Sequence, residues 1–128
     1  MEYIAMVVML SLLQYLYFII EVVRARARFD VPAPATSGND GFERYFRVQQ
    51  NTAEQLLLFL PAIYACGYYA SESLATFMGL LFVIGRMLYF RGYTNPDKSR
   101  ALGFALGLLA NAVMILATLF ALGSVLVG

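Results

Sequence analysis

Two runs of polar side chains at helical spacing carry the residue types that could do chemistry in this chain. Arg47, Asn51 and Glu54 are spaced i, i+4, i+7, which places them on one face of a helix. Further along, the spacing i, i+3, i+7 does the same for a second set, made of Arg86, Tyr89 and Tyr93. Guanidinium, amide and phenol groups side by side form a basic, hydrogen-bonding pocket suited to a small polar anion. Arg100, which opens the last apolar segment, would lie beside this pocket.

The composition shows which environment these residues must work in. The 128 residues are 61% hydrophobic and 13% charged, with a mean hydropathy of +0.70. Soluble domains are about 25% charged, and a soluble chain of this length could not hide so much apolar surface. The net charge of +1 provides no basic field for a nucleic acid. The sequence therefore predicts an integral membrane protein that binds membrane lipid and no nucleic acid.

The residues that are missing or rare exclude further kinds of chemistry. The chain has no histidine, so it has no imidazole base and no histidine-containing metal site, and we expect no bound metal. Cys66 is the single cysteine and lies within an apolar run, so no disulfide can form within the chain. We interpret it as a small buried hydrophobic residue rather than as a reactive thiol.

The apolar segments predict an all-α fold, a bundle of four membrane-spanning helices that forms a single domain over residues 1–128. The expected spans run from about 3 to 23, 44 to 70, 74 to 91 and 100 to 126. The second has an uncharged run of only about 15 residues, which covers roughly 22 Å of a hydrocarbon core about 30 Å thick. It must therefore include Asn51 and Glu54. Ionisable groups at such a depth usually face a bundle interior or a wet cavity.

The basic residues predict the orientation in the membrane. All nine Lys and Arg lie in the first and third loops or in the helix halves attached to them. By the positive-inside rule, loops 24–43 and 92–99 are cytoplasmic and both termini lie on the opposite side. Counted from the outer ends of the second and third spans, the two polar stripes then fall in one layer at the cytoplasmic leaflet.

The same residues also allow a purely structural interpretation. Intramembrane charges can hold helices together, and a pair between Glu54 and Arg86 would do so here. Gly103 and Gly107, four residues apart in the last span, are typical of a face on which two helices pack closely.

Two motifs carry a resemblance to a known family. Residues 42–54 read Phe-Glu-Arg, then Tyr-Phe, then Arg-Val-Gln-Gln-Asn-Thr-Ala-Glu, and residues 85–93 read Gly-Arg-Met-Leu-Tyr-Phe-Arg-Gly-Tyr. Together they resemble the MAPEG family, the membrane-associated proteins of eicosanoid and glutathione metabolism. This resemblance implies a homotrimer of four-helix protomers that holds glutathione as co-substrate between protomers, near the cytoplasmic face.

The resemblance also implies roles for individual residues. Arg47, Asn51, Glu54, Tyr89 and Tyr93 would bind glutathione, in the pocket to which spacing also assigns Arg86. Arg26 and Gln49 would contribute from the neighbouring chain, and Arg100 would be the catalytic residue that stabilises the glutathione thiolate. The chain also departs from the pattern, and two of these departures concern the site. Gln55 stands where some members have a tyrosine, and Ala101 stands where the isomerase branch has a serine.

The function implied is that of a membrane-bound glutathione transferase that conjugates glutathione to lipophilic electrophiles. Peroxidase activity toward lipid hydroperoxides is a further activity that the resemblance allows. Two alternatives stay open at this point. One is a non-catalytic lipid-binding or scaffold protein of the same family, and the other is a structural membrane protein whose charges only pack helices.

The orientation can be tested by cysteine labelling. Cysteines placed at Ser37 or Asp97 should be shielded from a membrane-impermeant thiol reagent in intact cells, whereas a cysteine at Ser73 should react. Labelling at Ser37 from outside the cell would reverse the orientation.

Overall fold

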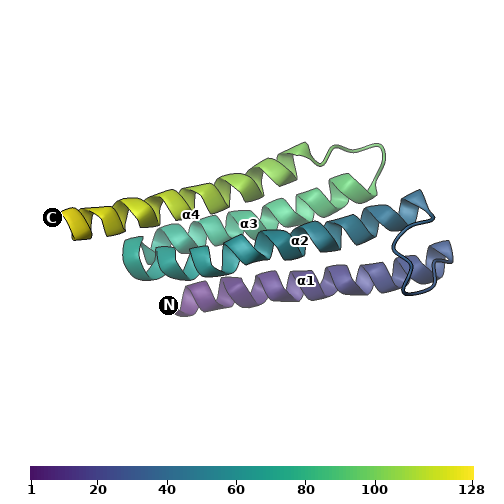
Figure 1. Cartoon of the computed structure of the whole chain (residues 1–128), viewed down its shortest axis with the longest axis horizontal. Coiled ribbons are helices and arrows are strands. Elements are labelled where there is room, and N and C mark those ends of the chain that lie inside the picture. Colours follow the sequence, from purple (N-terminus) through teal and green to yellow (C-terminus); the bar gives the residue numbers. More distant parts are fainter.

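The computed structural model describes all 128 residues and consists of helices and connecting segments, without strands. A π-helical turn, η1 (Cys66–Ala70), continues the second helix, and Figure 1 shows the helices lying lengthwise side by side. The helices are α1 (Glu2–Phe29), α2 (Asp40–Ala65), α3 (Glu72–Thr94) and α4 (Ala101–Val127). The predicted all-α, four-helix architecture is confirmed.

The helices extend beyond some of the spans expected from the sequence. The largest difference is in α1, which continues to Phe29, although we expected a linker from Arg24 onward. Arginine and alanine are good helix formers, so the Arg-Ala repeat keeps this segment helical. The helix ends where Asp30 takes a left-handed conformation, with φ of 55°. Where the bilayer boundary falls along each helix stays a prediction.

Three of the helices, α1, α3 and α4, are long and apolar enough to cross a membrane. α2 is not among them, because polar and charged residues occupy its first half. Much of the outer surface is apolar, with large exposed side chains such as Leu13 on α1, Leu57 on α2 and Phe120 on α4. Such a surface is suited to contact with lipid or with further apolar helices.

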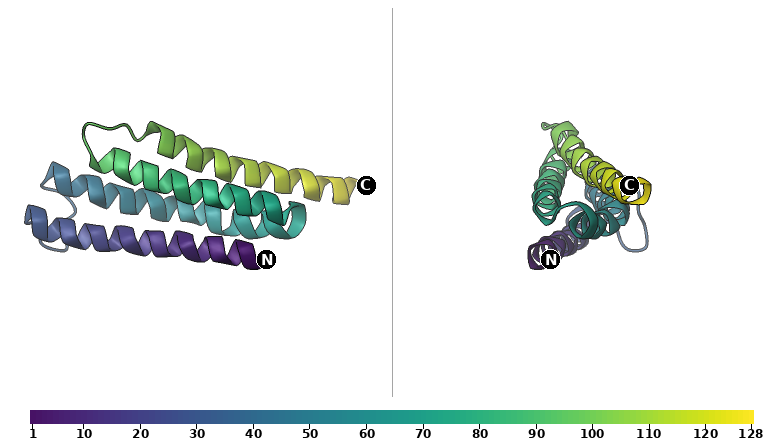
Figure 2. Two further views of the ribbon diagram at one scale, coloured as in Figure 1. Left: turned by 180° about the vertical axis from the view of Figure 1, so that it is seen from behind. Right: turned by 90° about the vertical axis from the view of Figure 1, so that its left-hand side faces the viewer.

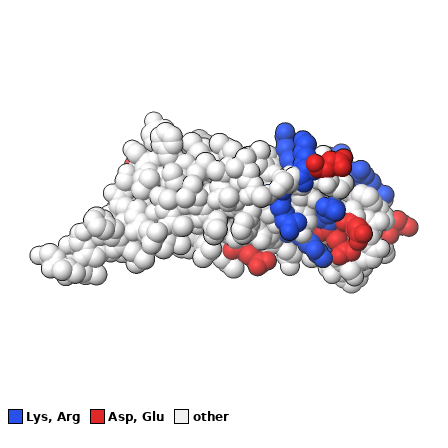
Figure 3. All heavy atoms as spheres, turned by 90° about the horizontal axis from the view of Figure 1, so that it is seen from above, with Lys and Arg blue, Asp and Glu red and all other residues white.

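Both chain termini lie at one end of the bundle, and the α1–α2 and α3–α4 connections lie at the other (Figure 1). We call this second end the loop end. On the face seen in Figure 3, the Lys and Arg side chains gather toward the loop end and the opposite half is largely uncharged. The predicted orientation rests on this gathering of basic residues at the loop end. Which side of the membrane the loop end faces remains a prediction.

Side-chain caps start two of the helices next to these connections. The Asn39 side chain accepts a hydrogen bond from the backbone N–H of Phe42 at the start of α2. At the tight α2–α3 connection, the Ser71 hydroxyl accepts from the N–H of Leu74. These caps fix where α2 and α3 begin, and so fix the register of the polar residues along each helix.

The main core lies between α1, α2 and α3, and α4, which packs mainly on α3 at the side of the bundle, contributes Ala110 and Met114 to it (Figure 2). In its centre, the rings of Phe59 from α2 and Phe82 from α3 stack at 4.0 Å between centroids. Nearer the loop end, Phe18 from α1 stacks on Phe90 from α3 at 5.0 Å. These aromatic contacts hold α2 and α1 on α3.

Glycines allow α3 and α4 to approach each other closely. A Cβ atom at Gly103 would collide with the backbone nitrogen of Tyr89 and would lie 2.6 Å from the carbonyl oxygen of Gly85. A Cβ at Gly107 would meet its nearest neighbours, in Arg86 and Phe82, at an ordinary 3.9 Å. Of the two glycines predicted to form a packing face, only Gly103 is therefore required by the backbone contact within the protomer.

This difference predicts the outcome of two alanine substitutions. Gly103→Ala should destabilise the protein by about 1–3 kcal/mol, because the new methyl group meets backbone atoms that cannot move aside. Gly107→Ala should have little effect and serves as the matched control. Thermal unfolding of the detergent-solubilised protein measures both. Equal stability of the two variants would show that the α3–α4 contact is looser than described.

Candidate functional site

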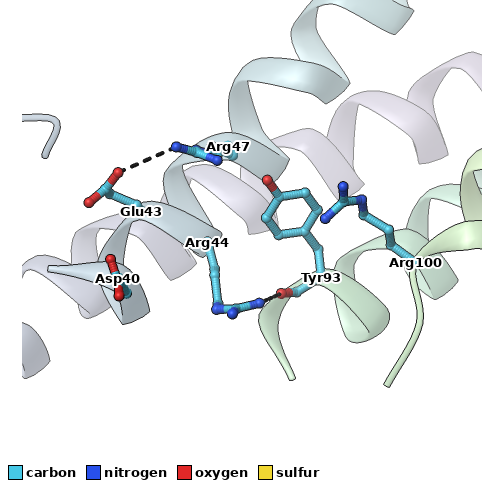
Figure 4. Close-up of a pocket in the computed structure, with 6 residues that line it drawn as sticks. All are labelled: Asp40, Glu43, Arg44, Arg47, Tyr93 and Arg100. Atoms are coloured by element: carbon cyan, nitrogen blue, oxygen red, sulfur yellow. Dashed lines mark hydrogen bonds and ion pairs between the residues drawn. The ribbon is translucent and has the colours of Figure 1, made fainter. Parts of the chain in front are cut away.

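A basic pocket lies at the loop end, where α2, α3 and the start of α4 meet (Figure 4). It has a volume of about 180 Å³ and is lined by Asp40, Glu43, Arg44, Arg47, Tyr93 and Arg100. A larger adjoining cavity of about 660 Å³ shares Arg44, Tyr93 and Arg100, and extends past Tyr89 to Phe104. Lys98 adds a further positive charge to its wall. Cations outnumber carboxylates across the two cavities, so together they are suited to an anion that also has an apolar part.

Tyr93 is the residue around which the arginines of the pocket are arranged. The Nη1 of Arg44 donates a hydrogen bond to the Tyr93 carbonyl oxygen at 3.2 Å. The guanidinium of Arg100 lies over the Tyr93 ring, 4.5 Å from its centroid. In Figure 4 the ring stands between Arg47 and Arg100, and Arg47 pairs with Glu43 at 3.5 Å. Three arginines from two different helix starts are thus brought within reach of one bound molecule.

Arg86 lies deeper in the bundle and is only 1% exposed. Its Nη2 donates to the Asn51 side-chain oxygen at 2.8 Å and to the Thr52 hydroxyl at 2.9 Å, and its guanidinium lies 4.2 Å from the Tyr89 ring centroid. Its Nε has no partner. The buried cation is therefore held by neutral acceptors and an aromatic face, and no carboxylate neutralises it.

The pairing of Glu54 with Arg86, which the structural interpretation of the sequence required, is absent from the protomer. Glu54 is exposed, while Thr52, two residues before it, is buried against α3. Residues two apart on an α-helix point in nearly opposite directions, so Thr52 and Glu54 cannot both face Arg86. Asn51 and Thr52 take the place that this interpretation assigned to Glu54.

The structure brings together some of the site residues expected from the sequence and leaves others apart. Arg47, Tyr93 and Arg100 share the basic pocket, Tyr89 lines the adjoining cavity, and Asn51 is joined to Arg86 behind Tyr89. Asn51 and Arg86 line neither cavity themselves but lie behind Tyr89, whereas Arg26, Gln49 and Glu54 neither line a cavity nor bond to a residue that does.

Arg26 makes contacts of its own near the end of α1. Its Nη1 donates to the Ala35 carbonyl oxygen at 2.6 Å, and its guanidinium lies 4.8 Å from the centroid of the Phe42 ring. These contacts tie α1 to the α1–α2 connection and to the start of α2. Within the protomer, Arg26 is therefore a residue of the loop end and does not reach the basic pocket.

Sequence reasoning missed Arg44 and Thr52. Arg44 lines both cavities, and its position three residues before Arg47 extends the polar stripe by one helical turn. That spacing was a usable signal. Thr52 offered none, because a hydroxyl within a polar run gives no sign that it faces a buried guanidinium on another helix.

Comparison with known proteins identifies the class. The family model of the MAPEG family matches residues 4–120, and the chain belongs to this family of integral membrane proteins. It is 42% identical to human microsomal glutathione S-transferase 2 over 108 residues, 83% of this chain and 74% of the relative. It is 37% identical to rat leukotriene C4 synthase over 119 residues, 93% of this chain and 78% of the relative. An uncharacterized protein of Synechocystis sp. is 40% identical over 118 residues, 92% of this chain and 86% of that protein.

The bonds around Arg86 predict an effect on stability. Thr52→Val keeps the shape of the side chain but removes one acceptor of a buried cation, which should cost about 1.5–3 kcal/mol. Thr118→Val is the matched control, because the buried Thr118 hydroxyl donates only to the Met114 carbonyl of its own helix. Thermal unfolding in detergent compares the two. A loss of the same size in both variants would mean that the contact with Arg86 is not the cause.

Proposed function

We propose that this protein is a membrane-bound glutathione transferase that conjugates glutathione to lipophilic electrophiles. The observation that carries the proposal is the convergence of Arg44, Arg47 and Arg100 around Tyr93 at the loop end. Glutathione is an anionic tripeptide with two carboxylates and a thiol, and its negative charge complements the excess of cations around the two adjoining cavities. The names of the two mammalian relatives, a glutathione S-transferase and a leukotriene C4 synthase, support the same substrate.

In this proposal the residues around the cavities divide the binding of glutathione among them. Arg47 pairs with a carboxylate, for which its forked guanidinium is suited. Asn51, Tyr89 and Tyr93 supply hydrogen-bonding groups, and Arg86 adds positive charge from behind Tyr89. Glu54, as a carboxylate, would accept from the ammonium group of the tripeptide.

Arg100 is the proposed catalytic residue. The glutathione thiol loses its proton to solvent, the thiolate attacks an electrophilic carbon, a sulfur–carbon bond forms and the leaving group departs with its electron pair. A thiol with a pKa of about 8.5 is only about 3% ionised at pH 7. A nearby guanidinium that lowers this pKa by about 2 units would raise the thiolate fraction about 25-fold.

Most of the rate must nevertheless come from elsewhere. The nucleophilicity of a thiolate falls with the pKa of its thiol, at a Brønsted slope of about 0.4–0.5. A pKa lower by about 2 units therefore reduces the rate constant of the thiolate roughly 6- to 10-fold. The net gain from acidity is then about threefold. Holding the thiolate next to a membrane-dissolved electrophile contributes the larger share, since orientation effects can be far greater. The same thiolate would also reduce lipid hydroperoxides, with two glutathione molecules giving the disulfide, an alcohol and water.

We further propose that the site is completed in a homotrimer. Arg26, Gln49 and Glu54 line neither cavity of the protomer, and Glu54 is exposed on a helix that the other three do not fully cover. An ionised carboxylate facing lipid is costly, so a neighbouring protomer against this face of α2 removes an unfavourable contact. The neighbour would also bring its own Arg26 and Gln49 toward the pocket.

The function is tested by glutathione binding to the purified protein, followed by turnover with a generic aryl halide. Saturable binding with release of halide supports the transferase. Saturable binding without turnover would instead support a non-catalytic lipid-binding or scaffold protein, and no glutathione binding would contradict the transferase.

The role of Arg100 predicts a shift in the pH profile. Arg100→Ala should raise the pKa of the bound thiol by about 2 units, remove thiolate absorbance near neutral pH and leave glutathione affinity largely intact. Turnover should partly recover at high pH. Arg91→Ala is the matched control, because Arg91 is exposed at the same end and lines neither cavity. Full thiolate signal and turnover at pH 7 in Arg100→Ala would remove this residue from catalysis.

The shared site predicts complementation between inactive variants. Glu54→Gln and Arg26→Ala should each weaken glutathione binding severely when expressed alone. If one protomer supplies Glu54 and its neighbour supplies Arg26, random co-assembly in trimers should restore about a quarter of the sites. Turnover of the co-expressed mixture at limiting glutathione measures this. A mixture no more active than the two variants assayed separately would place both residues in one protomer or outside the site.

A further inference from the structure

We infer that Gly92 and Tyr93, adjacent residues near the end of α3, are positioning residues for Arg100. Arg100 caps the start of α4, where its carbonyl oxygen accepts from the Phe104 N–H at 3.0 Å, yet its backbone also packs on Gly92 and its guanidinium lies on Tyr93, both in α3. This inference rests on the proposed function, in which Arg100 stabilises the glutathione thiolate. In addition, α3 determines the position of the Arg100 guanidinium.

Gly92 fixes the backbone of Arg100. A Cβ atom at position 92 would collide with the carbonyl oxygen of Ser99, and would lie 2.7 Å from the Ser99 carbonyl carbon and 2.8 Å from the Arg100 Cα. All three are backbone atoms, which cannot rotate away as the end of a long side chain can. Glycine at 92 therefore lets the α3–α4 connection pack directly against α3.

The connection itself is short and internally bonded. The backbone N–H of Lys98 donates to the Asn95 carbonyl oxygen at 3.0 Å, and the Asp97 N–H donates to the Asn95 side chain at 3.0 Å. The N–H of Ala101 donates to the Ser99 hydroxyl at 3.1 Å. These bonds restrict the backbone of the connection. Its packing against Gly92 therefore also positions the backbone of Arg100.

Tyr93 fixes the guanidinium. The Arg100 side chain is exposed and makes no salt bridge, and its guanidinium lies over the Tyr93 ring at 4.5 Å. Tyr93 is held in turn by Arg44 through the 3.2 Å bond to its carbonyl oxygen. Without the ring, a long arginine side chain at an exposed position would sample many rotamers.

An aromatic contact is suited to this task in a way that an ion pair is not. A carboxylate would orient Arg100 but would also neutralise the charge that the thiolate needs. The face of a tyrosine ring attracts a cation through its quadrupole and has no net charge. The guanidinium is therefore oriented while its full positive charge remains available to the bound sulfur.

Two substitutions at position 93 separate the ring from the hydroxyl. Tyr93→Phe keeps the ring and should leave the pKa of the bound thiol within about 0.3 units of the parent value, although glutathione affinity falls with the lost hydroxyl. Tyr93→Leu removes the ring and should raise that pKa by about 1 unit. The thiolate absorbance of bound glutathione against pH gives both values.

A second readout does not depend on activity. In protein with isotope-labelled arginine, the Arg100 guanidinium resonances should show a ring-current shift that Tyr93→Phe retains and Tyr93→Leu loses. Gly92→Ala should lose it too, and should raise the thiol pKa as Tyr93→Leu does, whereas Gly107→Ala should change neither. An unchanged Arg100 resonance in Tyr93→Leu or in Gly92→Ala would overturn the inference.

The comparison with Arg100→Ala distinguishes failure of this inference from failure of the proposed function. If Arg100→Ala raises the thiol pKa and Tyr93→Leu does not, Arg100 acts on the thiolate and the positioning role is wrong. If Arg100→Ala leaves the pKa unchanged, the catalytic role of Arg100 within the proposed function fails first, and absence of glutathione binding to the parent protein would overturn that function as a whole. In the Arg100→Ala background, Tyr93→Leu should add no further shift, and an additive shift would mean that Tyr93 acts on the thiol directly.

Discussion

A buried guanidinium with no carboxylate beside it is the interaction on which the arrangement of this bundle depends. Arg86 is 1% exposed and bonds to the neutral acceptors Asn51 and Thr52. In an apolar medium those two acceptors and the Tyr89 ring are what make the cation tolerable. They are available only if the polar face of α2 is turned toward α3. The rotation of α2 about its axis is therefore set by a polar contact, and the stacked rings of Phe59 and Phe82 pack in agreement with it.

This rotation determines which part of α2 reaches the loop-end pocket. Asn51 and Thr52 of α2 face α3. Arg47 and Arg44 lie one and two helical turns nearer the loop end, where they reach Tyr93 and Arg100. Glu54 is left on the exposed side. One helix thus presents its arginines to a pocket within the protomer and its carboxylate to whatever lies outside it, which is the geometric basis for proposing a site shared between protomers.

Two tyrosine rings on one face of α3, four residues apart, each lie against a guanidinium, at two depths in the bundle. Tyr89 lies under Arg86 and Tyr93 lies under Arg100, and the two rings are 5.5 Å apart. In both cases the ring orients a guanidinium without cancelling its charge. The result is a wall that stays electropositive at the edge of an apolar bundle, which suits the proposed binding of glutathione.

The sequence by itself determined the membrane class, the helical architecture, the clustering of the basic residues at the two loops and the family. These properties depend on composition, on helical periodicity and on contiguous motifs, all of which are local along the chain. It also predicted that Arg47, Tyr93 and Arg100 would come together, because spacing fixes the face of each helix and counting along the spans puts the polar faces at one depth.

Only the tertiary structure decided which groups pair across helices. Arg86 bonds to Asn51 and Thr52 rather than to Glu54. A Cβ atom added at Gly103 would collide with backbone atoms of α3, whereas one added at Gly107 would not. The tertiary structure also placed Arg44 in the pocket and the Arg100 guanidinium on a ring from α3. Periodicity gives the angle of a residue around its own helix, but the rotation and crossing of one helix against another follow from the packing of all the side chains between them.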